Sequence, residues 1–149
     1  MATGKPSRQT IEIDGRELKV SNLDKVLYPA AGFRKADVID YYRRIAPVML
    51  LHLAGRPPTL VRAPDGPGGP RFFEKNCPSH RPSWFRTVEI ESSGRRSGRD
   101  RPERIGYCLI ESAAHLVWTA NMAALELHPG LQVADDLSEG VLTMFGPDA

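Results

Sequence analysis

Alternating apolar and polar residues near the start of the chain predict a β-hairpin. The two segments run from Thr10 to Ile13 and from Glu17 to Val20, and Asp14-Gly15-Arg16 lies between them. An Asp-Gly pair at that place is typical of a tight hairpin turn, because both residues tolerate a left-handed backbone. We therefore expect two short antiparallel strands here.

A helical pattern follows over residues 35–54. Apolar side chains recur there at steps of three and four, which places them on one face of an amphipathic helix: Val38, Tyr42, Ile45, Met49 and Leu53. Pro47 lies inside this segment and removes one backbone donor. We expect the helix to kink or restart near Ala46.

The rest of the chain alternates short strands with one buried helix. Residues 112–124 are apolar over most of a helical circumference, so this helix is expected inside the protein. Short strands are predicted at residues 59–62, 71–73, 85–91, 105–110 and 125–128. The expected fold is α+β (α/β) in two layers, a mixed or antiparallel sheet packed by two main helices.

Composition adds the class of protein. The chain has 149 residues, 41% of them hydrophobic, which suits one soluble globular domain with a real core. No apolar run approaches the ~20 residues that cross a bilayer, so we expect no membrane association. Residues 1–8 resemble no secretory signal, and the cytoplasm, at the bacterial nucleoid, is the expected location. We expect Cys77 and Cys108 to be free thiols there.

Charge is distributed unevenly. Residues 1–104 carry a net charge of +8 and residues 105–149 a net charge of −6, and 15 of the 20 basic side chains are Arg. Arginine suits bidentate contacts with phosphate, which favours a nucleic-acid partner. A GC-rich genome also raises the arginine content, and both interpretations stay open. Residues 92–104 are rich in Ser, Gly and Arg, and we expect a mobile basic loop.

Two lysines form a candidate phosphate site. Lys25 and Lys35 flank a Pro-Gly turn, and Lys35 follows Arg34 at the expected helix start. Cations there oppose the helix macrodipole, whereas an anion bound by the lysines and the unpaired backbone amides would reconcile the charges. The alternative is two solvated lysines.

Adjacent aromatic residues form a second candidate site. Phe72 and Phe73 lie side by side in an expected strand, so alternation should direct one ring to the core and the other to the surface. An exposed Phe beside Arg71 and Lys75 would suit base stacking on nucleic acid. The alternative is that a bent strand buries both rings.

The histidines and cysteines show no metal-binding or catalytic pattern. Cys77 and His80 have ligand-like spacing at one end only, which argues against zinc. His115 on the buried helix suits a core position, and His128 at a strand end is the better functional candidate. The sequence contains no Ser-His-Asp order, phosphate-binding P-loop or dinucleotide fingerprint.

Several motifs, in order, resemble the N-terminal half of the polymerase domain of bacterial DNA ligase D. That family belongs to the archaeo-eukaryotic primase superfamily and serves double-strand-break repair by non-homologous end joining with Ku. The resemblance covers residues 10–136, and we expect residues 1–9 to be a disordered tail and 137–149 a divergent one. The motifs are SNLDKVLYP (21–29), DYY (40–42), IAPVM (45–49), GRP (55–57), VR (61–62), PDG (64–66), FFEK (72–75) and ALELHP (124–129).

The resemblance implies roles for particular residues. Lys25 and Lys35 match the two lysines that hold the 5′-phosphate on the downstream side of a DNA gap. One of Phe72 and Phe73 matches the ring that packs on template bases. His128 matches a histidine of the incoming-nucleotide pocket, and Arg62 falls in the strand near that pocket.

The sequence departs from the family at the metal site. The family follows the segment that matches Ala134-Asp135-Asp136 with an Asp-x-Asp pair, which binds Mg²⁺ or Mn²⁺ and the nucleoside triphosphate. Residues 141–149 here contain no such pair. We therefore expect a truncated protein with no catalytic residue and no bound cofactor of its own, and Arg34 in place of the usual Thr or Ser N-cap.

Three functions follow from the resemblance. The first is a module that binds 5′-phosphorylated DNA ends or gapped DNA without extending them. The second is a template-directed nucleotidyltransferase whose missing half comes from a second polypeptide, and the third is a gene remnant. Ku, a DNA ligase, the second-half polypeptide or another copy of the chain are the protein partners to consider, because half a domain exposes a sheet edge.

Overall fold

The computed structural model describes residues 8–92 and 103–130. Residues 1–7 of the predicted N-terminal tail, the predicted C-terminal tail, most of the predicted basic loop, and Ala134-Asp135-Asp136 lie outside these residues. Arg8 and Gln9, which we expected in the disordered tail, belong to a strand instead. The elements, in chain order, are β1 (Arg8–Ile13), β2 (Arg16–Ser21), β3 (Val26–Tyr28), β4 (Phe33–Arg34), α1 (Lys35–Leu53), β5 (Pro58–Arg62), β6 (Phe72–Glu74), β7 (Thr87–Ser92), β8 (Glu103–Cys108), α2 (Ala113–Asn121) and β9 (Ala124–Pro129).

The predicted N-terminal hairpin is confirmed. β1 pairs antiparallel with β2, and Ile13 lies opposite Arg16. The connecting residues Asp14 and Gly15 have φ values of 52° and 79°. Two consecutive left-handed residues form the turn whose twist matches that of the strands, which is why Asp-Gly occurs here.

Both predicted helices are present, with different ends. α1 runs through Pro47 without interruption, so the predicted restart near Ala46 is wrong. Pro47 is exposed, where the lost backbone bond costs least. α2 ends at Asn121, three residues before its predicted end, because Ala123 adopts a left-handed φ of 57° that turns the chain into β9.

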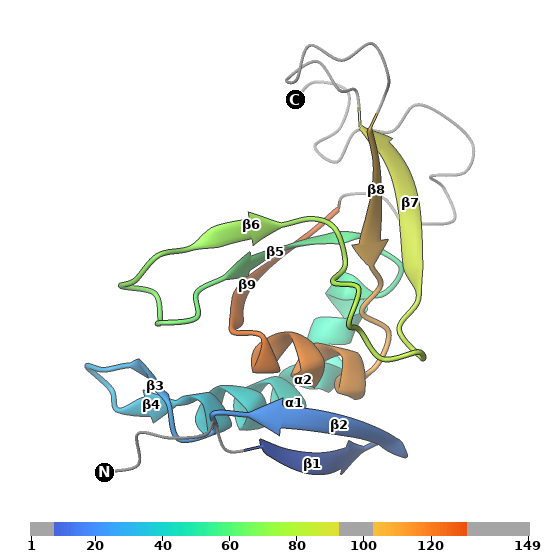
Figure 1. Ribbon diagram of the computed structural model, residues 1–149. Helices are drawn as coiled ribbons and strands as arrows, with labels where there is room; N and C mark the ends of the chain where they lie inside the picture. Colours follow the sequence, from blue (N-terminus) through green and yellow to red (C-terminus); the bar gives the residue numbers. More distant parts are fainter. Residues whose placement is uncertain (1–7, 93–102, 131–149) are drawn as a thin grey trace.

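The strands form small antiparallel sheets. The largest has the order β6-β5-β9, and β7 pairs with β8 in a long hairpin. In Figure 1 the two helices lie between the three-stranded sheet and the N-terminal hairpin, while β7 and β8 project away from them. The predicted α+β class is confirmed, with antiparallel pairing throughout the described residues.

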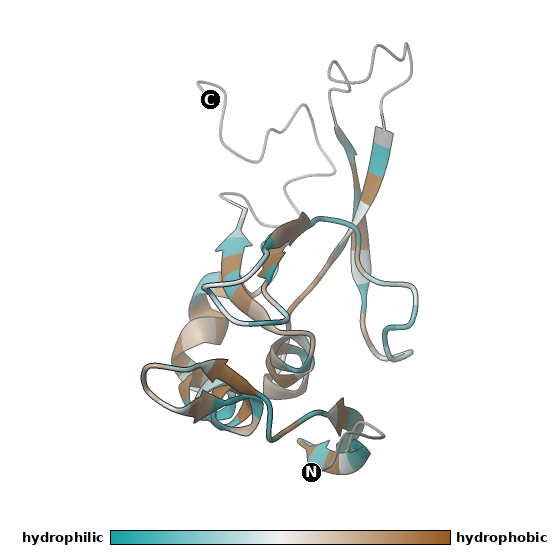
Figure 2. Cartoon of the chain, turned by 60° about the vertical axis from the view of Figure 1, so that its left-hand side comes forward, coloured by the Kyte–Doolittle hydropathy of each residue, from teal (hydrophilic) through white to brown (hydrophobic). Residues whose placement is uncertain are grey.

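The core lies where α1 crosses α2. Residues 114–120 of α2 are all buried, as its apolar circumference predicts. Side chains from both helices join Leu18 and Val20 of β2 and Leu60 of β5 in one hydrophobic cluster. Figure 2 shows hydrophobic and hydrophilic residues alternating along the projecting hairpin. No helix within residues 8–92 and 103–130 has the length and apolar character needed to cross a bilayer.

The prediction of free thiols is wrong, because Cys77 and Cys108 form a disulfide. Their Cα atoms lie 4.8 Å apart, within the usual range for such a bond. The approach comes from backbone pairing: the Cys77 amide donates to the Gly106 carbonyl at 2.7 Å. This contact places the segment after β6 against the end of β8, which no local sequence pattern reveals.

Candidate functional site

A cavity of about 290 Å³ opens between the two lysine-bearing segments and the end of α2. Three of its lining residues are cationic, Lys25, Lys35 and Arg62. We call this cavity the cationic pocket. Its other lining residues are Ser21, Asn22, Leu27, Pro64, His80, Asn121, Met122 and Ala123.

Backbone hydrogen bonds bring the two lysines together. The Lys35 amide donates to the Lys25 carbonyl at 2.8 Å, and the next amide, of Ala36, donates to Leu23 at 3.0 Å. The short hairpin of β3 and β4 closes the ten-residue separation between the lysines. The predicted convergence of Lys25 and Lys35 therefore occurs.

One part of the phosphate-site prediction is wrong. The first two amides of α1 donate to carbonyls of the preceding loop, so they do not point at an anion. Arg34 provides no side-chain cap, and its amide donates to Asp37 Oδ2 at 2.8 Å. The Asp37 carboxylate supplies the negative charge that the helix N-terminus favours. These two amides are therefore not available to an anion in the cationic pocket.

Lys35 is the most unusual group of the pocket. Only 5% of the residue is exposed, and no side-chain hydrogen bond or ion pair within the described residues involves its ammonium. Burial, and to a smaller extent the charges of Lys25 and Arg62, lower the pKa of Lys35 to about 8. A buried, uncompensated cation is costly, and such groups concentrate at functional sites.

Lys25 has a partner outside the pocket. Its ammonium lies 2.8 Å from Asp65 Oδ1, and the two side chains are 40% and 67% exposed. Asp65 is not among the lining residues, although its neighbour Pro64 is. Lys25 therefore lies between the cavity and a carboxylate.

Arg62 is held in place by contacts on three sides. Nε donates to the Met122 carbonyl at 2.9 Å, and one terminal nitrogen pairs with Glu74 at 2.9 Å. The guanidinium carbon lies 5.1 Å from the centre of the Phe72 ring. These contacts fix a planar cation at the pocket wall.

Sequence reasoning missed the residues that α2 and the segment after β6 contribute. Asn121 accepts a hydrogen bond from the Ser21 amide at 2.9 Å, which fastens the end of α2 to the end of β2. His80 reaches the pocket with its ring 5.7 Å from that of Trp118. The only local signal at His80 was its spacing from Cys77, which is typical of zinc ligands and does not predict a place in an anion-binding pocket.

Both aromatic residues of β6 are exposed, Phe72 by 43% and Phe73 by 68%. The prediction that one ring enters the core is wrong, as is the alternative that both are buried. β6 is the edge strand of its sheet, next to β5, and within the described residues no helix covers either of its faces. Phe72 lies opposite Arg62 and against its guanidinium, while Phe73, the next residue along the strand, is the more exposed ring.

His128 lies apart from the cationic pocket. It pairs with Thr59 near one end of the β5–β9 ladder, whereas Arg62 lies opposite Ala124 at the other end. Its side chain is 56% exposed, and Nε2 is 3.5 Å from Glu126. Arg62 therefore lines the cationic pocket together with the two lysines, and His128 does not line it.

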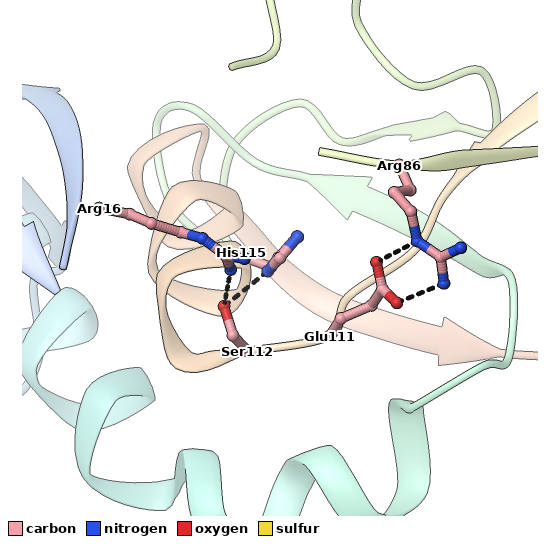
Figure 3. Close-up of polar contacts among 5 residues, drawn as sticks. All are labelled: Arg16, Arg86, Glu111, Ser112 and His115. Atoms are coloured by element: carbon pink, nitrogen blue, oxygen red, sulfur yellow. Dashed lines mark hydrogen bonds and ion pairs between the residues drawn. The ribbon is translucent and has the colours of Figure 1, made fainter. Parts of the chain in front are cut away.

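A second polar group, which we call the His115 cluster, consists of Arg16, Ser112 and His115. Arg16 donates to Ser112 Oγ at 2.9 Å, and Ser112 Oγ lies 2.7 Å from His115 Nδ1 (Figure 3). Beside it, Arg86 and Glu111 form a two-point ion pair with distances of 3.0 and 2.6 Å. Burial lowers the pKa of His115 to about 4, which keeps the imidazole neutral.

No cluster of three or more His, Cys, Asp or Glu side chains in the described part of the chain is arranged to hold a metal ion. The polar chemistry of the cationic pocket is that of donors and positive charge. Three cationic side chains around one cavity favour an anionic ligand.

The chain is similar to known proteins in sequence and in fold. The family named "LigD, primase-polymerase domain" matches residues 34–145, more than half of the chain. LigD of Mycobacterium bovis is 43% identical over 113 residues, which are 76% of this chain and 14% of that protein. LigD of Mycolicibacterium smegmatis is 41% identical over 126 residues, 85% of this chain and 16% of that protein.

A solved structure resembles the fold. The polymerase domain of Mycobacterium tuberculosis ligase D, in complex with DNA, aligns with a TM-score of 0.67 and 42% identity, over 76% of this chain and 37% of that one. The chain thus spans a small part of its full-length relatives. With its fold and more than half of its sequence matched, the chain belongs to the LigD primase-polymerase domain family.

Proposed function

We propose that this chain binds the 5′-phosphate of DNA ends in the cationic pocket, as part of bacterial double-strand-break repair by non-homologous end joining. The observation that carries the proposal is the buried Lys35, which lies beside Lys25 and Arg62 with no anionic partner among the described residues. A phosphate dianion would supply the negative charge that Lys35 lacks, since Lys25 and Arg62 already have carboxylate partners. The related ligase D polymerase domain, solved in complex with DNA, supports a nucleic-acid ligand.

The exposed rings of β6 extend the proposal. Both Phe72 and Phe73 are exposed, and Phe72 lies against Arg62, which itself lines the pocket. Bases stack on such rings without regard to sequence, at roughly 1–3 kcal/mol per base. We therefore assign the pocket to the terminal phosphate and the β6 surface to template bases. His128 has the exposure needed for a nucleotide contact, but the pocket does not depend on it.

The test compares gapped DNA that carries a 5′-phosphate with gapped DNA that carries a 5′-hydroxyl. The Lys25→Ala, Lys35→Ala double variant should lose the preference for phosphate, because two charge-assisted contacts are worth about 2–4 kcal/mol. A Lys19→Ala, Arg43→Ala variant is the matched control, since it removes two exposed charges outside the pocket. Equal binding of both DNAs by the unmodified chain would contradict the proposal.

We also propose that these 149 residues by themselves bind ends without extending a primer. Residues 134–149 contain Asp135, Asp136 and Asp148 but no Asp-x-Asp pair. Adjacent carboxylates on a strand point to opposite faces, so Asp135 and Asp136 do not fit the family's metal pair. Template-dependent nucleotide incorporation by this polypeptide with Mg²⁺ or Mn²⁺ would contradict the proposal.

A further inference from the structure

Asp65 is held at the edge of the pocket by a tight turn. The Gly66 amide donates to the Ala63 carbonyl at 2.9 Å and closes the turn after β5. Gly66 has a φ of +91°, and a Cβ atom there would lie 1.9 Å from the Leu27 carbonyl oxygen. The turn therefore packs directly on the backbone of β3, two residues beyond Lys25, and only glycine allows this approach.

The two lysines of the pocket consequently differ in their surroundings. Lys35 is buried without an anionic partner in the described residues, whereas Lys25 is paired with Asp65 at 2.8 Å. The carboxylate approaches the Lys25 ammonium from outside the cavity, because Asp65 does not line it. Half of the proposed phosphate-binding pair is thus already neutralised.

We propose that Asp65 competes with the 5′-phosphate for Lys25 and so determines how strongly the chain prefers phosphorylated ends. The inference rests on the proposed function of the pocket. A phosphate between the lysines brings two negative charges close to the carboxylate, and the resulting repulsion opposes binding. A 5′-hydroxyl end places no charge in the pocket, so Asp65 affects the two kinds of end unequally.

The test replaces the carboxylate in two ways. Asp65→Asn removes the charge and keeps an acceptor for Lys25, and Asp65→Ala removes both. Exposed ion pairs contribute little to folding, so both variants should fold normally. We expect Asp65→Asn to bind 5′-phosphorylated gapped DNA about three- to tenfold more tightly at low salt, with binding of 5′-hydroxyl DNA changed less than about twofold.

Asp24→Asn is the matched control. Asp24 is adjacent to Lys25 in sequence, and its carboxylate lies 3.6 Å from Arg34, a cation that does not line the pocket. Both substitutions change the net charge equally, so an equal gain in the two variants would overturn the inference in favour of a general electrostatic effect.

A loss of affinity for phosphorylated ends in Asp65→Asn would also overturn it, because the carboxylate would then be positioning Lys25. The unmodified chain, measured in parallel, reports on the proposed function separately. If it shows no preference for phosphate, the assignment of the pocket itself fails. If the preference is present but Asp65→Asn leaves it unchanged, only the role of Asp65 fails.

Discussion

The cationic pocket and the His115 cluster each contain a buried titratable residue, Lys35 and His115, but the two residues have different surroundings. In the His115 cluster, Nδ1 of the buried imidazole is hydrogen-bonded to Ser112 Oγ, which also accepts from Arg16, whereas His115 Nε2 is buried without a hydrogen-bond partner in the described residues. The Arg16 guanidinium lies 5.0 Å from the centre of the Trp84 ring. In the pocket, Lys35 is a buried residue whose side chain has no hydrogen-bond or ion-pair partner among the described residues, and it lines a cavity. The neutral imidazole leaves one uncharged atom unpaired among packed aromatic rings, whereas Lys35 carries a charge to a cavity that a ligand can enter.

The largest expected effect separates stability from binding at the His115 cluster. His115→Ala removes a buried ring whose centre lies 4.5 Å from the centre of the Phe85 ring and 4.8 Å from that of Trp84. It also removes the hydrogen bond to Ser112. We expect the free energy of unfolding to fall by about 2–4 kcal/mol, measured by urea denaturation.

The preference of the folded His115→Ala variant for 5′-phosphate should stay the same. His128→Ala is the control, because that side chain is exposed and its loss should cost less than ~0.5 kcal/mol. A folded His115→Ala protein that no longer distinguished 5′-phosphate from 5′-hydroxyl would show that the two regions are coupled.

A smaller effect is expected at the pocket, where the preference for 5′-phosphate should depend on pH. The pKa of Lys35 is lowered to about 8, so its charge is lost as the pH rises past that value. The preference for 5′-phosphate should therefore fall between about pH 7.5 and 9.5, by roughly tenfold for one charge-assisted contact. Fluorescence anisotropy with phosphorylated and hydroxyl-ended DNA across this range measures it.

Stability should change in the other direction over the same range. The folded-state pKa of Lys35 lies below its unfolded value, so the unfolded chain binds the proton more strongly and the free energy of unfolding rises with pH above about 8. Lys35→Met keeps the apolar stem and should abolish the contribution of Lys35 to both trends. Parallel trends in stability and binding would exclude Lys35 as the titrating group.

The parts of the site that depend on nearby residues could be predicted from the sequence. Lys25 and Lys35 are ten residues apart, and one short hairpin joins them, so their charges at a helix start were an informative signal. The loop carbonyls that occupy the first amides of α1 were not predictable, because this pairing depends on the exact path of the chain.

Contributions from distant segments could not be predicted. His80 and Asn121 reach the pocket only after α2 packs on β2, and residues 77 and 108 meet only through backbone pairing beside β8. Strand alternation failed at Phe73 for a related reason, since it assumes that one face of the sheet is covered, and β6 is an edge. Hydrophobic periodicity identified the helices because burial of one face is a property of the segment itself.

The cationic pocket draws its walls from four separate stretches of chain, at residues 21–35, 62–64, 80 and 121–123. No single hairpin or helix contains it, so it exists only when the N-terminal hairpin, the sheet and α2 have all assembled. A ligand that binds there recognises the completed fold and not the unfolded chain. By mass action such a ligand shifts the folding equilibrium toward the native state, by ~2.7 kcal/mol at a hundred times its Kd. DNA ends that bind in the pocket would therefore raise the free energy of unfolding of the protein.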